Sequence, residues 1–281
     1  MRIDQNTALA FKAPAAEPVP MPGAANPASN RPEPLRLVAA NDAGVASTSS
    51  GAVATQGLLA QDVYNDQAQP PEGFRVADAD DLSALGLSPS LLSEGEFRAR
   101  VYVTGEGASA EYTIAFRGSQ SASDWVNNAQ QGLGLDSAHY RSALAIGERI
   151  ARSDLAGQVR FTGHSLGGGL ASAAAIASGR PADTFNAAGL HEDTIADARA
   201  IHQASAVPGQ AQVDSWQVQG EILSLIQDGG DRVLNPLLDL PEAYGERHVL
   251  DAVAPDGTGF FGRFNPVARH GMDWVLSSLP G

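Results

Sequence analysis

The sequence of 281 residues predicts an α/β fold in which a mostly parallel central sheet has helices on both faces. From about residue 97 onward, short apolar runs with strand spacing alternate with longer runs that have helical spacing. Strands that alternate with helices are typical of parallel sheets, because each crossover helix returns the chain to the same edge of the sheet. Hydrophobic residues make up 43% of the chain, which is sufficient for a large core.

Residues 1–52 differ in composition from the rest. Seven of the 17 prolines lie before residue 35, alanine is abundant, and Phe11 is the only aromatic residue. Such a segment buries too little apolar surface to offset its ordering entropy. We therefore expect residues 1–52 to be a disordered segment and residues 53–281 to form one domain. The segment is either a plain linker or a leader that contacts a secretion machinery, and its start lacks the apolar core of a cleavable signal peptide.

The remaining elements follow in order. Residues 56–64 have helical spacing, and the strand at 97–103 alternates apolar with polar side chains, so one face should be buried. The turn residues at 105–107 lead to a second strand at 112–116, which predicts a hairpin. Further elements are expected as a helix at 137–152, a strand at 159–162, a helix at 167–178, a strand at 183–186, a helix at 195–204, a strand at 213–218, an irregular stretch to about 267, and a helix at 272–279.

Composition excludes several classes of partner and cofactor. The formal net charge is −14, and because charges balance through residue 50, the whole acidic excess lies in residues 51–281. Such a chain is not expected to bind nucleic acid, or to adsorb to anionic membranes by charge alone. Cysteine is absent, which excludes thiolate metal sites and disulfides. No apolar run is long enough for a transmembrane segment.

Ser165 lies in a G-x-S-x-G motif, between a short apolar run and an Ala-rich run. A serine at a strand-to-helix turn has a strained backbone and presents its hydroxyl above the edge of the sheet. The flanking Gly163 and Gly167 leave room there. This context favours a catalytic nucleophile over a plain glycine-rich turn.

A nucleophilic serine needs a base and an orienting acid, which in α/β-hydrolases follow in the order Ser, Asp or Glu, His. Four histidines come too early in the chain or point elsewhere: His139, His164, His191 and His202. His270, in a loop that enters the last helix, is the favoured base. The alternatives are His248 in a charged stretch, or a capping or solvated role for His270.

The acid is predicted at Glu221, just past the end of the 213–218 strand, where such sheets display catalytic groups. Asp228 competes with it, whereas Asp214 should face away from the site. The oxyanion needs two donors: the backbone N–H of Leu166, and Ser119 at the corner after the 112–116 strand. Asp124 is interpreted as a helix N-cap.

Three parts of the sequence together resemble the class 3 (fungal-type) lipase family. They are the Ala115–Ser119 stretch with Asp124-Trp125 downstream, the Thr162–Gly168 stretch around the serine, and the His270 loop. The resemblance implies an α/β-hydrolase with a Ser-Asp/Glu-His site, Ser119 as an oxyanion residue, and no metal or cofactor in catalysis. One departure is Glu221, since the family usually has Asp there.

The resemblance implies a serine carboxylester hydrolase, of the lipase or phospholipase A type, that cleaves lipid esters through an acyl-enzyme at a membrane or micelle surface. A non-catalytic interaction protein on the same scaffold and a small-ester or thioester hydrolase remain alternatives. A bacterial phospholipase effector exported without a cleaved signal is one expectation for location, and the cytoplasm is the other. The stretch 229–265 is a candidate acyl pocket or lid, or ordinary packing.

Overall fold

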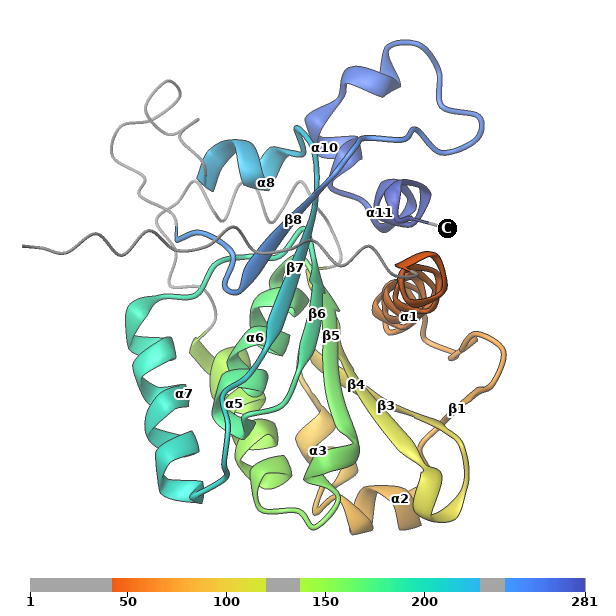
Figure 1. Ribbon diagram of the computed structural model, residues 1–281. Coiled ribbons are helices and arrows are strands. Elements are labelled where there is room, and N and C mark those ends of the chain that lie inside the picture. The colour runs from red at the N-terminus through yellow and green to blue at the C-terminus, as the bar shows by residue number, and fades with distance from the viewer. Residues whose placement is uncertain (1–41, 120–136, 228–240, 281) are drawn as a thin grey trace, which may run out of the picture. The chain divides into compact units, whose positions relative to one another are not determined.

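The computed structural model describes residues 42–119, 137–227 and 241–280, with backbone only for residues 42–50 and 137 (Figure 1). The predicted N-cap Asp124 and the competing acid Asp228 lie outside these ranges. So do residues 1–41 and most of the first half of the predicted acyl-pocket stretch.

One sheet of eight strands runs through the described domain in the order β1-β3-β4-β5-β6-β7-β8, with β2 paired to β3 at the side. The first three strands of this order are antiparallel, and all pairs from β4 to β8 are parallel. The predicted hairpin and the mostly parallel sheet are therefore confirmed. The strands are β1 (Phe74–Val76), β2 (Ser93–Glu94), β3 (Phe97–Thr104), β4 (Glu111–Phe116), β5 (Val159–His164), β6 (Ala182–Phe185), β7 (Val213–Val218) and β8 (Glu246–Leu250).

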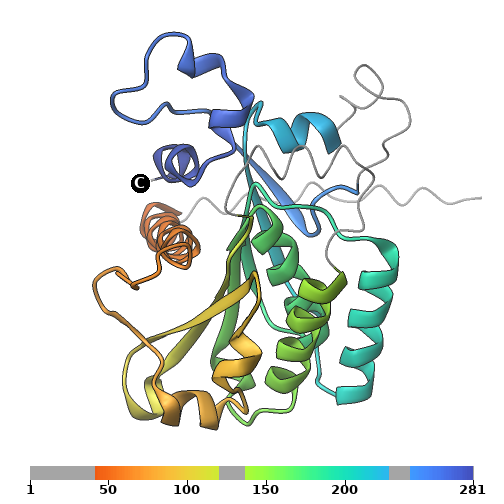
Figure 2. The same cartoon turned by 180° about the vertical axis from the view of Figure 1, so that it is seen from behind.

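Helices cover both faces of the sheet, as the sequence predicts. Figures 1 and 2 show α5, α6 and α7 together on one face and α1 and α11 on the other. The longer helices are α1 (Asp42–Asp62), α5 (Ser137–Ala151), α6 (Leu166–Ser178), α7 (Glu192–Ser205) and α11 (Met272–Ser278). The short ones are α2 (Ala79–Ala84), α3 (Pro89–Leu92), α8 (Ile222–Leu225), α10 (Pro266–Arg269) and the 3₁₀ turns η1 (Gly107–Ser109), η2 (Ala156–Gln158) and η4 (Gly262–Phe264).

Small side chains let α6 sit deep in the main core. Every residue of this Ala- and Gly-rich helix is buried, between the sheet and helices α5 and α7. A Cβ atom placed on Gly147 of α5 would lie 2.6 Å from the carbonyl oxygen of Ala174, so the two helices pack backbone to backbone there. This close packing fixes the start of α6, which follows Ser165 directly.

The end of α1 covers the face of β3 that the sequence analysis left open. Tyr102 is fully buried and donates a hydrogen bond of 2.7 Å to the Asp62 carboxylate, which also pairs with Arg100 at 3.3 Å. On this face Tyr102 and Arg100 contact the end of α1, and Arg98 pairs with Asp66 just beyond that helix. The predicted face of β3 is buried, and its other face is partly covered as well, because the polar side chains there have partners far away in sequence.

Two other predictions about elements need correction. The stretch expected to be irregular contains β8, an edge strand whose polar residues Glu246, Arg247 and His248 hid its strand pattern. Residues 42–52, expected to be disordered, belong to α1, since their Ala- and Ser-rich sequence continues into the buried part of that helix from Val53 onward. Within the described ranges, no helix is long and apolar enough to cross a membrane.

Candidate active site

Ser165 lies at a sharp turn between β5 and α6. Its φ of 59° and ψ of −128° are a backbone conformation that non-glycine residues seldom adopt. A Cβ at Gly163 would collide with the backbone of Gly167, and a Cβ at Gly167 would collide with the carbonyl oxygen of Phe116. The two glycines of the motif are thus needed for close backbone approach, as expected for a strained nucleophile turn.

The three residues predicted for catalysis lie within hydrogen-bond distance of one another. The distance from His270 Nε2 to Ser165 Oγ is 2.9 Å, and the distance from His270 Nδ1 to Glu221 Oε2 is 2.7 Å. Only 4% of Ser165, 1% of His270 and none of Glu221 is exposed, so the hydrogen bonds are shielded from water. The site lies past the carboxyl ends of β5 and β7, where an α/β-hydrolase fold presents its reactive groups.

Glu221 is held firmly although it is one methylene longer than the Asp expected from the resemblance. It is the N-cap of α8, and its carboxylate accepts hydrogen bonds from the N–H groups of Leu223, at 2.8 Å, and Ser224. The Ser224 hydroxyl donates a further hydrogen bond to it. Gly220, with a φ of 72°, turns the chain between β7 and this cap. The turn and the cap together aim the carboxylate at His270.

His164 contacts the site, contrary to the expectation that it points elsewhere. Its Nε2 donates to the main-chain oxygen of His270 at 2.6 Å, so its Nδ1 is free to accept a hydrogen bond from the Tyr64 hydroxyl at 3.1 Å. The Tyr64 hydroxyl in turn accepts the N–H of Gly118 at 3.0 Å. Burial, with a smaller contribution from the neighbouring His270, lowers the pKa of His164 from 6.5 to about 3, so His164 stays neutral.

Asn186, which follows β6, is a second supporting residue that the sequence analysis missed. Its side-chain amide donates to the main-chain oxygen of His270 at 3.1 Å, and its side-chain oxygen accepts the N–H of Val218 at 2.9 Å. Its φ of 41° suits asparagine better than most residues. An asparagine directly after a parallel strand is the only sequence signal that pointed here.

The corner after β4 packs against the serine turn. A Cβ at Gly118 would lie 2.6 Å from the carbonyl oxygen of His164 and 3.3 Å from the N–H nitrogen of Gly167. This brings Ser119, the next residue, to the side of the turn where α6 begins. The first N–H groups of a helix have no acceptor within the helix, which leaves that of Leu166 available. The oxyanion roles of Ser119 and Leu166 remain predictions.

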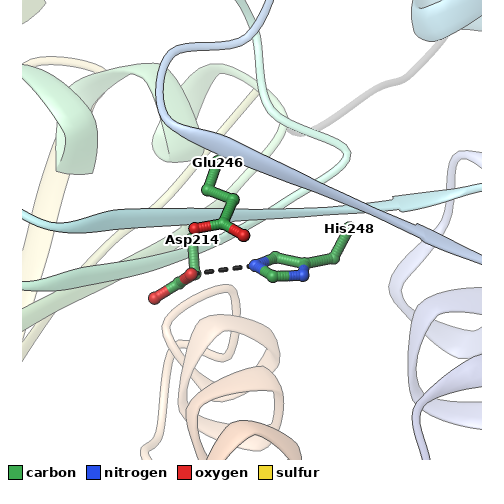
Figure 3. Close-up of side chains that lie close together, drawn as sticks. All are labelled: Asp214, Glu246 and His248. Atoms are coloured by element: carbon green, nitrogen blue, oxygen red, sulfur yellow. Dashed lines mark hydrogen bonds and ion pairs between the residues drawn. The ribbon is translucent and has the colours of Figure 1, made fainter. Parts of the chain in front are cut away.

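His248, the alternative base, lies elsewhere on the sheet. Its Nε2 is 2.8 Å from Asp214 Oδ1, and its ring stacks on Trp216 with centroids 4.3 Å apart. Figure 3 shows His248 and Glu246 on one strand beside Asp214 on the next. The ligand atoms of these three residues lie within 4.8 Å of one another, a spacing that a metal ion could also use. The hydrogen bond between His248 and Asp214 explains why these two side chains lie close together, and no metal ion is needed to explain it.

Known proteins similar to this chain are esterases and phospholipases. The model of the phospholipase-like family, described as the Tle-like phospholipase domain, matches residues 55–260. An extracellular phospholipase A1 from Serratia liquefaciens is 36% identical over 238 residues, which cover 79% of this chain and 68% of that protein.

Two solved esterases show weaker likeness. An esterase of the archaeon Pyrobaculum calidifontis is 14% identical, with 83% of this chain and 90% of that chain covered and a TM-score of 0.32. The thermostable carboxylesterase EstE1, cloned from a metagenomic library, is 15% identical, with 83% and 96% covered and a TM-score of 0.33. Both scores are too low to support a structural argument. The family match and the Serratia relative carry the conclusion that this chain belongs to the Tle-like phospholipase domain family and is a phospholipase-type hydrolase.

Proposed function

We propose that the protein is a serine phospholipase of the A type, in which Ser165 is the nucleophile, His270 the general base and Glu221 the acid that orients His270. The observation that carries the proposal is the unbroken line of hydrogen bonds, at 2.9 and 2.7 Å, from Ser165 through His270 to Glu221. The strained backbone of Ser165 supports it further, because such strain is found where a side chain must be presented for reaction.

In the first half of the reaction, His270 Nε2 removes the Ser165 proton as Oγ attacks the carbonyl carbon of an acyl ester. The N–H of Leu166 and Ser119 stabilise the resulting oxyanion. His270 then gives the proton to the oxygen of the leaving lysophospholipid, and the ester bond breaks. In the second half, water attacks the acyl-Ser165 ester as His270 takes a proton from it. His270 then returns this proton to Ser165 Oγ as the acyl-oxygen bond breaks and the fatty acid leaves.

The finer assignments are also proposals. The resemblance to the class 3 lipases rests on the same turn, corner and histidine that form this site, which supports a shared mechanism. Action outside the producing cell, as an exported effector that a secretion machinery handles through the N-terminal segment, is supported by the name of the Serratia relative, which is extracellular. A phospholipid at a membrane or micelle surface would then be the substrate.

The proposal is tested by comparing the protein with its Ser165→Ala variant on phospholipids, triglycerides and short p-nitrophenyl esters. We expect the wild type to release fatty acid from phospholipids, and the variant to lose at least about 10³-fold in kcat, since only residual binding effects remain. A fluorophosphonate probe should label Ser165 in the folded wild type. An unlabelled, inactive wild type would instead favour a non-catalytic scaffold, and activity confined to short esters would favour a small-ester hydrolase.

A further inference from the structure

We propose that three phenylalanines on the segment between β8 and α10 form the surface by which the enzyme docks on a phospholipid bilayer; this inference rests on the proposed function. The three residues are called the phenylalanine patch: Phe260, Phe261 and Phe264. They are 71%, 87% and 66% exposed, among the most exposed large apolar residues in the described ranges. Soluble proteins seldom leave such a cluster in water unless it binds something.

The rings of the patch pack on one another rather than into a core. The centroids of Phe260 and Phe261 are 5.5 Å apart, and those of Phe260 and Phe264 are 5.6 Å apart, both in edge-to-face geometry. This mutual packing gathers them into one apolar projection. Aromatic rings at a bilayer surface replace water with acyl chains, which is favourable in proportion to the apolar area removed from water.

The patch lies on the side of the domain that carries the active site. The segment leaves the carboxyl end of β8 and leads through α10 directly to His270 (Figures 1 and 2). Arg269 fixes it there, because its guanidinium donates to the main-chain oxygen of Arg263 at 2.7 Å and to that of Gln219 at 3.0 Å. Gln219 is two residues before Glu221. Docking through the patch would therefore hold the site at the lipid surface.

The charged residues near the phenylalanine patch favour a phospholipid as its binding partner. Between residues 258 and 270 the chain carries Arg263 and Arg269 and no acidic residue, although its net charge is −14. Arg263 is exposed beside Phe264, where its guanidinium can reach lipid phosphate. An acidic protein cannot adsorb by overall charge, so a local apolar and cationic surface provides the attraction that the rest of the chain lacks.

The experiment measures binding to vesicles of phosphatidylcholine mixed with phosphatidylglycerol, by co-sedimentation. All proteins carry Ser165→Ala, so that the lipid is not hydrolysed. The triple variant Phe260→Ser, Phe261→Ser, Phe264→Ser should lose at least about tenfold in vesicle partitioning, which corresponds to about 1.4 kcal/mol. The matched control replaces the exposed valines of two strands, Val76→Ser and Val249→Ser, which are 40% and 62% exposed, and should bind as before.

Two further measurements separate this inference from its alternatives. With Ser165 intact, the triple Phe variant should hydrolyse a soluble short-chain ester like the wild type, but vesicle lipid more slowly. The emission of Phe261→Trp should shift to the blue when vesicles are added. Unchanged vesicle binding by the triple variant would overturn the inference, and so would a patch-dependent dimer in sedimentation velocity without vesicle binding. If the wild type cleaves no ester at all, the proposed function fails, while the binding assay still decides the role of the patch.

Discussion

His164 and Asn186 both donate to the main-chain oxygen of His270, and Tyr64 fixes the far side of the His164 ring. None of the three is bonded to the Ser165 hydroxyl, so they are positioning residues. The rings of His164 and His270 are close, with centroids 4.9 Å apart. A second positive charge there would oppose the imidazolium that His270 forms during the proposed reaction. Because burial keeps His164 neutral, no second positive charge opposes the protonation of His270 in the proposed reaction.

The buried His164 also predicts a pH dependence of stability. Burial lowers its pKa from 6.5 to about 3, so between these values the unfolded chain binds a proton that the folded chain does not. The stabilisation is fully present above about pH 6.5 and is lost as the pH falls toward about 3, by at most about 1.4 kcal/mol per pH unit. The His164→Gln variant should lack this contribution.

Urea unfolding of the wild type and His164→Gln at pH 7 and pH 5 checks this prediction. The variant should be the less stable protein at pH 7, since it loses the hydrogen bonds to Tyr64 and His270. The gap in the free energy of unfolding should narrow at pH 5. A gap that is the same at both pH values would show that His164 does not titrate as the buried geometry requires.

At the scale of elements, the turn after β5 and the corner after β4 depend on each other through glycine. We expect Gly167→Ala to destabilise the fold by about 1–3 kcal/mol, because the new methyl group would collide with the Phe116 carbonyl oxygen. Activity should fall further than stability does, since the collision displaces Ser119 and Leu166 together.

The matched control is Gly51→Ala in α1, where a Cβ would meet nothing within 4 Å. Because alanine favours helix over glycine by about 1 kcal/mol, this variant should be as stable as the wild type or more so. Thermal unfolding and ester hydrolysis of both variants provide the comparison. A fully active, fully stable Gly167→Ala protein would contradict the close packing described here.

The sequence predicted an element well where the element's own residue pattern determines its structure, and poorly where contacts with distant residues do. The strand at β3 and the Ala-rich helix α6 were predicted within a residue or two, since their periodicity depends on one buried face or on small side chains. Strand β8 was missed because an edge strand carries charges. The supporting residues Tyr64 and Asn186 were missed for another reason. Tyr64 bonds to a histidine 100 residues away, and no local pattern encodes such a contact.

The site residues could be proposed from order along the chain, because the serine motif and the sheet topology restrict where an acid and a base can stand. The sequence favoured His270 over His248 by its position before the last helix, and the structure adds the contacts that distinguish the two. Both histidines have a carboxylate partner, at 2.7 and 2.8 Å, but only His270 also contacts Ser165. The sequence shows which residues could act as base or acid, whereas the fold determines which of their side chains are in contact.

At the scale of the whole molecule, the first described helix completes the fold. Val53, Leu59 and Val63 are buried, and Gly57 faces the side chains of Leu276 and Leu279. We expect removal of residues 1–41 to leave the unfolding temperature and the hydrolysis of soluble esters unchanged. Removal of residues 1–64 should abolish folding or activity, since it takes away the cover of β5 and the hydroxyl of Tyr64.

Removal of residues 1–52 tests whether the domain begins at residue 53, as the composition predicts, or at residue 42, where α1 begins. If the boundary lies at 52/53 as the composition predicts, this protein should unfold at the same temperature as the one lacking residues 1–41. A lower unfolding temperature would show that the early turns of α1 contribute to the domain. Circular dichroism melts of the three truncations, together with their activity on a short ester, make the comparison.

The backbone of Ser165 has a consequence for how such a chain would change once its activity no longer mattered. A φ of 59° is unfavourable for any residue with a Cβ, by about 1–3 kcal/mol, and alanine would keep that strain while glycine would relieve it. A descendant released from selection for catalysis would therefore gain stability by replacing this serine, the proposed nucleophile, with glycine. If Ser165 is the nucleophile as proposed, a serine with this backbone in a relative would indicate that the relative is still used as an enzyme.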